Sequence, residues 1–352
     1  MVGADGALPL PWLATPLKQG LQAQAHALLL YGPEGVGQFD LALTLAQGWL
    51  CEAPVSAPAR PCGRCAACRL VQAHSHPDLL VLLPDALREP LGWAGGEADE
   101  GGAEKASKAK PSKEIKVEAV RAAVAFAQTT SARGHGKVVV LHPAERINAI
   151  ASNALLKTLE EPPGNARFLL SCAAPEALLP TIRSRCQALH LALPPAELAT
   201  QWLGARGVAE PGVLLAACGG QPLQALQWSE EGIDAKLWSQ LPTLMLRGET
   251  APFLNWPLPR LVEALQKLCH DALCVASGAA PRYFPPGTVG RGADNVALTD
   301  WARQLTRIAR HAEHPWSAGL LVESLVNEAR TALVPHGIAG RGAPGKPIHS
   351  DG

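Results

Sequence analysis

The sequence predicts a doubly wound α/β domain followed by an all-helical region. Short, near-continuous apolar runs alternate with helical patterns over residues 1–193, and such runs are typical of parallel strands covered on both faces. After Pro194 the strand pattern ends and only helical patterns follow. We therefore place an α/β domain at 1–193, a small helical domain at 194–235 and a larger helical domain at 236–334.

Length and composition agree with several globular domains. The chain has 352 residues, which is too many for one comfortable core, and 47% of them are hydrophobic. Lys plus Arg and Asp plus Glu number 31 each, so the chain as a whole is not an obvious polyanion binder. It has no apolar run long enough for a membrane span and no basic segment of the signal-peptide kind. We expect a cytoplasmic protein without a membrane partner.

Five apolar runs in the first domain are the expected strands. They are Leu28–Tyr31, Asp78–Leu83, Lys137–Leu141, Phe168–Ser171 and Ala188–Leu193. Three helical patterns lie between them, at Phe39–Leu50, Val117–Thr129 and Asn148–Glu161. Pro162 and Pro163 close the last of these, because proline cannot continue a helix.

Helical patterns also fill the second half of the chain. They are Ala196–Arg206, Val213–Ala217, Leu223–Trp228, Leu258–Val275, Ala297–His311 and Ser317–Leu333. Ser317 is a plausible N-cap of the last pattern. The tail at 335–352 is rich in Gly and Pro, and we expect it to be unstructured.

One segment of the first domain differs in composition from its surroundings. Residues from about 86 to 113 comprise an acidic half, a basic half and several glycines, without apolar anchors. This composition predicts a disordered surface insertion. The alternative is a partner-binding arm.

Four cysteines form the pattern C-x10-C-x2-C-x2-C, at Cys51, Cys62, Cys65 and Cys68. Thiolates two residues apart on a tight turn reach one ion together, and four of them complete the tetrahedron of a structural zinc site. The alternative, ordinary buried thiols, fits poorly with the polar, proline-rich residues between them. Two nearby histidines are alternative ligands, although we expect them to be loop residues; they are His74 and His76.

The first expected strand runs into a glycine-rich loop. Gly32, Gly35 and Gly37 keep the spacing of a phosphate-binding loop. However, Gln38 stands where such a loop needs lysine for the phosphates, and Phe39 stands where it needs a hydroxyl for magnesium. The loss of both groups predicts that ATP is not retained.

A second element of a nucleotide site is also missing. The strand at Lys137–Leu141 is followed by His142 and Pro143, at the point where an acidic residue would hold magnesium. Two independent losses indicate a nucleotide-binding fold whose catalytic site is absent. The alternative is a domain that never bound nucleotide.

An arginine follows a short helical stretch, directly before the last expected strand, in the triplet Ser184-Arg185-Cys186. Its planar guanidinium suits bidentate contact with phosphate. Supplied to the nucleotide of a neighbouring subunit, Arg185 would act as an arginine finger. The alternative is a helix-end arginine that hydrogen-bonds to carbonyl groups.

Several segments together resemble the delta-prime family of bacterial DNA polymerase III clamp-loader subunits. They are "HPDLLVL", "PSKEIKVEAVR", "NALLKTLEEPPGNARFLL" and "LLPTIRSRC", and the likeness covers roughly residues 10 to 230. The resemblance implies an AAA+ module at 1–193 with a zinc module at 51–68, a helical lid at 194–235 and a helical collar at 236–334. It also implies a ring of five with gamma or tau and delta subunits. That assembly loads the beta sliding clamp onto primer-template DNA at the nucleoid.

The resemblance further implies a role for each candidate residue. Arg185 would be an arginine finger in trans, and the four cysteines would hold structural zinc. The degenerate loop and the His142-Pro143 pair would leave the chain without ATP, a non-hydrolysing part of a DNA-directed DNA polymerase holoenzyme.

Two other functions are weighed against this one. An ATP-hydrolysing gamma or tau type subunit would need Lys and Thr at 38 and 39 and an acid at 142. A zinc-dependent nucleic-acid-binding module would need basic and aromatic residues around the cysteines, where only three arginines occur.

Overall fold

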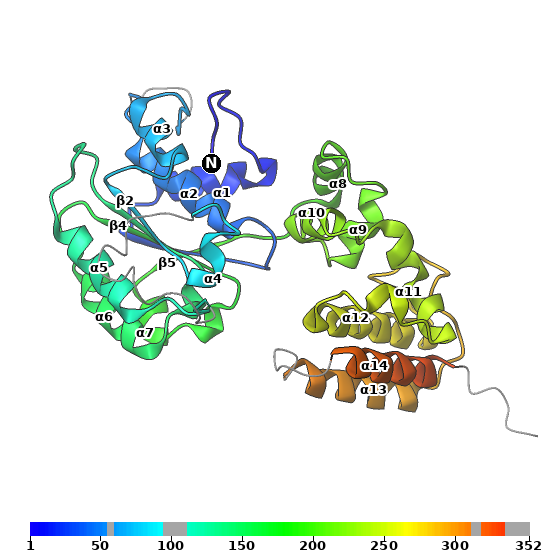
Figure 1. Cartoon of the computed structure of the whole chain (residues 1–352). Coiled ribbons are helices and arrows are strands. Elements are labelled where there is room, and N and C mark those ends of the chain that lie inside the picture. The colour runs from blue at the N-terminus through cyan, green and yellow to red at the C-terminus, as the bar shows by residue number, and fades with distance from the viewer. Residues whose placement is uncertain (55–59, 94–110, 311–317, 335–352) are drawn as a thin grey trace, which may run out of the picture. The chain divides into compact units, whose positions relative to one another are not determined.

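The computed structural model of the chain describes residues 1–54, 60–93, 111–310 and 318–334 (Figure 1). It divides into two compact units, Met1–Leu198 and Ala199–Gly352. The division falls within helix α8 (Ala196–Gly204) rather than after Leu193. The predicted tail at 335–352 and the N-cap at Ser317 lie outside the described residues.

The first unit contains one five-stranded parallel sheet with the strand order β2-β3-β4-β1-β5. The strands are β1 (Ala27–Tyr31), β2 (Leu79–Leu82), β3 (Val138–Leu141), β4 (Arg167–Cys172) and β5 (Gln187–His190). The predicted parallel sheet is therefore confirmed. Strand β5 ends at His190 instead of Leu193.

Helices cover both faces of this sheet (Figure 1). Leu29 of β1 packs in a core with residues of α5 and α6, whereas Leu28 and Leu30 are equally buried but lie outside that core. This alternation follows from the two-residue period of a strand. The helices of this unit are α1 (Ala14–Gln22), α2 (Gln38–Leu50), α3 (Ala66–Gln72), α4 (Asp85–Arg88), α5 (Val117–Gln128), α6 (Ala149–Glu160) and α7 (Pro180–Arg183), with short 3-10 turns at Pro11–Leu13, Ala144–Arg146 and Pro175–Ala177.

The expectation that every strand is covered on both faces is wrong for β5. Its residues Gln187, Ala188 and His190 are exposed, whereas β3 is buried throughout. The reason is position, because β5 lies at the edge of the sheet and has a neighbouring strand on one side only.

Part of the segment predicted to be disordered is structured. Within 86–113, the chain continues helix α4, and the backbone N–H of Ala86 donates to the carbonyl of Ser112 at 3.1 Å. An ion pair of 2.8 Å joins Lys116 to Asp85. These contacts fix both arms of the insertion, so the prediction is wrong for 86–93 and 111–113; residues 94–110 lie outside the described part.

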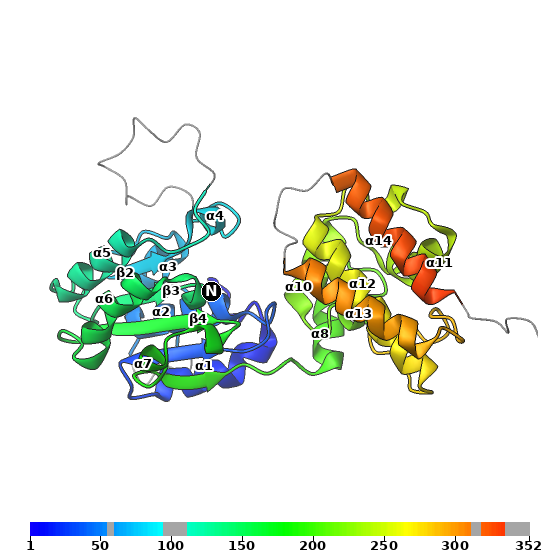
Figure 2. The ribbon, with the colours of Figure 1, turned by 90° about the horizontal axis from the view of Figure 1, so that it is seen from below.

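The second unit is helical, as predicted. Its helices after α8 are α9 (Pro211–Ala217), α10 (Pro222–Glu230), α11 (Ala235–Arg247), α12 (Leu258–Ala276), α13 (Asn295–Ala309) and α14 (Ala318–Leu333), with a 3-10 turn at Ala251–Phe253. Helices α12, α13 and α14 lie side by side (Figure 2). None of the helices in the described ranges combines the length and the apolar composition that a membrane span requires.

An aromatic cluster crosses the expected boundary between lid and collar at 235/236. Trp228 of α10 and Trp238 of α11 have ring centroids 5.2 Å apart, and Trp238 also stacks on Phe284 at 4.6 Å. Asp271 of α12 is fully buried, and its carboxylate accepts backbone N–H bonds from Arg282, Tyr283 and Phe284. One core thus joins the two predicted subdomains, whose separation stays a prediction.

Candidate functional site

The glycine-rich loop connects the carboxyl end of β1 to the start of α2. Gly37, with φ +94°, is the left-handed N-cap of α2, and a side chain there would collide with Leu10. A side chain at Gly32 would collide with the backbone carbonyl of Leu191, just beyond β5. Packing and backbone conformation therefore require these glycines whether or not a phosphate binds.

The Gln38 side chain closes the loop on itself. It is only 6% exposed, and its Nε2 donates to the carbonyl of Gly32 at 2.7 Å and of Pro33 at 2.6 Å. A lysine at this position would carry a charge toward a phosphate, whereas this amide is satisfied by the loop's own backbone. The indole Nε1 of Trp12 also donates to the loop, at the carbonyl of Val36.

Phe39 and His142 fill the position where a magnesium site would need oxygen ligands. Their rings stack with centroids 4.6 Å apart and planes 23° apart. The Nδ1 of His142 lies 3.0 Å from the hydroxyl of Ser171, which itself donates to the carbonyl of Leu141. Burial lowers the pKa of His142 to about 4, so its imidazole is neutral at pH 7. None of these groups offers the anionic oxygen that magnesium prefers.

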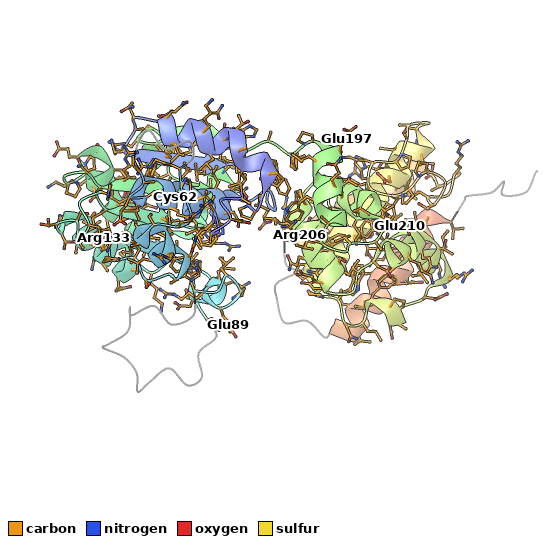
Figure 3. All side chains as sticks on the ribbon, turned by 90° about the horizontal axis from the view of Figure 1, so that it is seen from above. Cys62, Glu89, Arg133, Glu197, Arg206 and Glu210 are labelled. Carbon is orange, nitrogen blue, oxygen red and sulfur yellow. The ribbon has the colours of Figure 1, made fainter. Side chains whose placement is uncertain are left out.

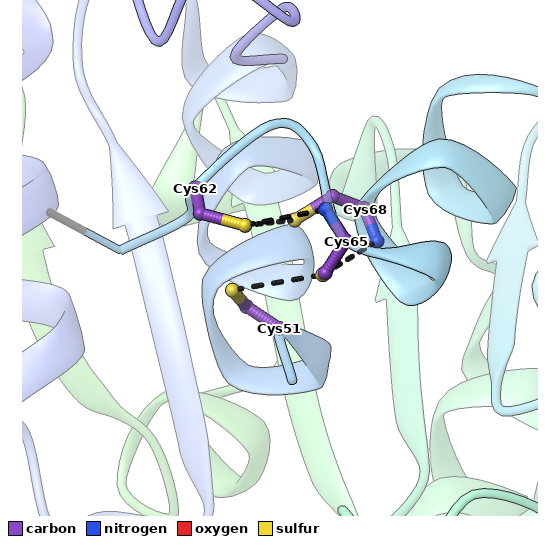
Figure 4. A group of neighbouring side chains, drawn as sticks. All are labelled: Cys51, Cys62, Cys65 and Cys68. Carbon is purple, nitrogen blue, oxygen red and sulfur yellow. Dashed lines mark hydrogen bonds between the residues drawn. The ribbon is translucent and has the colours of Figure 1, made fainter. Parts of the chain in front are cut away.

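The four cysteines converge on one point (Figure 4). Their Sγ atoms all lie within 4.8 Å of one another, with Cys62 and Cys68 at 4.0 Å and Cys51 and Cys65 at 3.9 Å. Cys65 is the N-cap of α3, and its Sγ accepts the backbone N–H of Cys68, while the Sγ of Cys62 accepts that of Cys65. The backbone N–H of Arg64, foremost, lowers the pKa of Cys62 to about 6, whereas burial, foremost, raises the pKa of Cys68. This donor set fits one zinc ion.

Other parts of the first unit hold the cysteine cluster in place. A side chain at Gly63, with φ +70°, would collide with the carbonyl of Gly3, so the N-terminal segment lies directly against the turn. Glu52, next to Cys51, forms an ion pair with Arg133 (labelled in Figure 3). The cluster is therefore continuous with the α/β core.

Neither nearby histidine joins the cysteines. His74 stacks on Trp93 with centroids 3.9 Å apart. His76 is 4% exposed, and its Nδ1 accepts the backbone N–H of Asp78 at 3.0 Å. Both are residues of the connection into β2, which agrees with the expectation that they are loop residues.

Arg185 lies between α7 and β5 and is 29% exposed. Its Nε donates to Glu160 at 2.8 Å, and its Nη1 donates to the carbonyl of Thr181 at 2.8 Å. Ile182, fully buried in the core, anchors the α7 turn beneath it. The Arg185 side chain borders a shallow pocket of about 430 Å³ with Glu160 and His26. Sequence reasoning did not find Glu160, because nothing in one sequence shows which carboxylate faces an arginine 25 residues later.

The loop and the arginine lie at opposite ends of the parallel strands. We call the side of the sheet where the strands end the carboxyl edge and the side where they begin the amino edge. Gln38 and His142 follow the carboxyl ends of β1 and β3, whereas Arg185 precedes the amino end of β5. Because all five strands are parallel, their carboxyl ends share one edge. A strand of five residues is about 16 Å long, so Arg185 cannot reach the loop of its own domain.

A family model described as "DNA polymerase III, delta subunit" matches residues 13–195, more than half of the chain. The chain is also 33% identical over 274 residues to DNA polymerase III subunit delta′ of Escherichia coli K12, which covers 73% of this chain and 74% of that protein. The chain belongs to the delta-prime family of DNA polymerase III.

Two further relatives match shorter stretches. The delta′ subunit of Pseudomonas aeruginosa is 39% identical over 229 residues, covering 63% of this chain and 62% of that protein. The tau subunit of Escherichia coli K12 is 34% identical over 166 residues, or 47% of this chain and 21% of tau. The match thus spans less than two thirds of the Pseudomonas delta′ protein.

Proposed function

We propose that this chain is the delta-prime subunit of a clamp loader and acts as a non-hydrolysing AAA+ stator. It lends Arg185 in trans to the ATP site of a neighbouring gamma or tau subunit. Its partners are those subunits and delta in a ring of five, which loads the beta sliding clamp onto primed DNA.

One observation carries this proposal: the glycine-rich loop and Arg185 lie at opposite ends of the parallel strands. At the carboxyl edge, Gln38 closes the glycine-rich loop, and the Phe39–His142 stack takes the place of magnesium ligands. At the amino edge, Arg185 is partly exposed and near the surface. Such a guanidinium contributes to hydrolysis only if another subunit brings its nucleotide to this edge.

Clamp-stimulated ATP hydrolysis by a reconstituted loader tests the proposal. We expect Arg185→Ala to abolish turnover at the one site that it faces, since an arginine finger contributes about 10³-fold or more to kcat. Arg185→Lys should not restore it, because lysine lacks the planar fork. Arg183→Ala, which removes an exposed charge from α7, is the matched control.

The chain alone gives a second readout. We expect it to neither bind nor hydrolyse ATP, whereas a gamma or tau type subunit would do both. Undiminished turnover with Arg185→Ala, or rapid ATP hydrolysis by the isolated chain, would overturn the proposal.

A further inference from the structure

A second concave site lies at the amino edge of the sheet and has no role in the function proposed above. It is a pocket of about 800 Å³ between the ends of α1 and α2 and the segments that lead into β3 and β4. Its polar lining includes Arg60, Arg167, His26, His135 and Asn165. No acidic residue lines it among the described residues. We name it the amino-edge pocket.

Arg167 is the central cation of the amino-edge pocket. It is the first residue of β4, and its backbone N–H donates to the carbonyl of Lys137 at 2.8 Å, so the sheet fixes its position. Its guanidinium lies 4.6 Å from the ring centroid of Trp49, in the last turn of α2. Burial lowers the pKa of Arg167, yet no carboxylate of the described residues lies within ion-pair distance.

Arg60 is a second cation without a carboxylate partner in the described part of the chain. One Nη donates to the carbonyl of Cys51, while its buried Nε has no acceptor there. The other half-buried arginines of this unit are paired, Arg88 with Asp85, Arg133 with Glu52 and Arg185 with Glu160. A half-buried guanidinium without a counter-ion is costly, and here two of them line one pocket.

We propose that the amino-edge pocket binds a phosphate group, carried by a small phosphorylated molecule or by a nucleic-acid backbone. Arginine is suited to phosphate because its planar fork gives bidentate, charge-assisted bonds. A carboxylate ligand has two oxygens, and one guanidinium can pair with both of them, so a carboxylate would not account for two arginines in one pocket. The oxygens of a phosphate can accept from both arginines and from the imidazole and amide donors of His135 and Asn165, whereas the Nε2 of His26 already donates to the carbonyl of Leu159 at 2.6 Å. The volume is that of a small-ligand site, well above the space one carboxylate needs.

Calorimetric titration of the full-length, zinc-loaded chain with inorganic pyrophosphate tests this proposal. We expect saturable binding that weakens about tenfold for each arginine removed in Arg60→Gln and Arg167→Gln. Arg167→Lys should retain more affinity than Arg167→Gln. Arg121→Gln, an exposed arginine of α5, is the matched control for charge and should bind as the wild type does.

Zinc content and thermal unfolding verify that each variant is folded. If substitution of Arg167 disturbs β4, Arg60→Gln still tests the pocket, because Arg60 lies outside the sheet. Arg185→Ala distinguishes the two basic sites of this edge, since His26 borders both pockets. We expect this variant to bind pyrophosphate normally.

The source of the phosphate is decided by competition with a short single-stranded thymidine oligonucleotide. Displacement of pyrophosphate assigns the pocket to nucleic acid, and binding of pyrophosphate without displacement assigns it to a small phosphorylated ligand. The proposal is overturned if pyrophosphate does not bind, if only Arg185→Ala abolishes binding, or if a glutamate-rich peptide binds the pocket in preference to pyrophosphate.

Discussion

The glycine-rich loop and the cysteine cluster were both predicted from residue spacing, but they differ in where their side chains find partners. In the loop, Gln38 bonds to the loop's own carbonyls, and Phe39 stacks on His142. In the cluster, four sulfur atoms approach one another around a common point. Polar groups that are satisfied internally have no need of a ligand, whereas convergent thiols need one. We therefore expect a metal ion at the cluster and no nucleotide at the loop.

The largest effect is expected at the cluster. Cys65→Ser should reduce zinc from one ion per chain to nearly none and destabilise the first unit by more than about 3 kcal/mol, because binding energy at a structural site is also folding energy. Metal analysis and denaturant unfolding measure both. Cys274→Ser, which alters a half-buried thiol of α12, should change neither. Unchanged zinc content in Cys65→Ser would contradict the four-thiolate site.

The next effect is a pH dependence in the loop region. Burial lowers the folded-state pKa of His142 to about 4 from its usual 6.5. Its contribution to stability is therefore fully present above pH 6.5 and is lost as the pH falls toward 4. Between about pH 7.5 and about pH 5 the loss should be about 2 kcal/mol.

Comparison with His142→Gln isolates this contribution, because loss of zinc in acid affects both proteins alike. The variant should lose less stability than the wild type over the same interval in denaturant unfolding. Equal losses would show that His142 is not buried in its neutral form.

A smaller effect is expected from opening the loop. Gln38→Ala leaves the buried carbonyls of Gly32 and Pro33 without their donor, which should cost about 1.5 kcal/mol in the free energy of unfolding. Gln19→Ala, at an exposed position of α1, is the matched control. If the two variants unfold alike, the closure of the loop contributes nothing to stability.

The smallest effect is expected at Glu160. Its ion pair with Arg185 is largely exposed, with 49% of the Glu160 side chain accessible, so Glu160→Gln should change stability by less than about 1 kcal/mol. In the reconstituted loader, ATP turnover with Glu160→Gln should stay within about twofold of the wild type, whereas Arg185→Ala should remove the contribution of one ATP site. A loss as large with Glu160→Gln would mean that the carboxylate itself is needed for catalysis.

Most of the fold was predictable where a local pattern has one interpretation. The five strands and helices α2, α5, α6 and α12 lie within a few residues of their expected positions. Helix α11 was missed because Pro242 lies inside it, and an interior proline normally indicates a helix end. Its caps were nevertheless visible, since Asp234 bonds to the N–H of Leu237 and Gly248 ends the helix in a left-handed conformation.

By itself the sequence determined the parallel α/β domain, the helical second half, the cysteine spacing and the missing lysine and hydroxyl of the loop, because each depends on neighbours along the chain. Only the tertiary structure decided that Gln38 closes its own loop, that Glu160 holds Arg185, and that Arg60 and Arg167 share a pocket. Those contacts join segments whose approach is set by strand order and helix packing. No local periodicity encodes which distant side chains then meet.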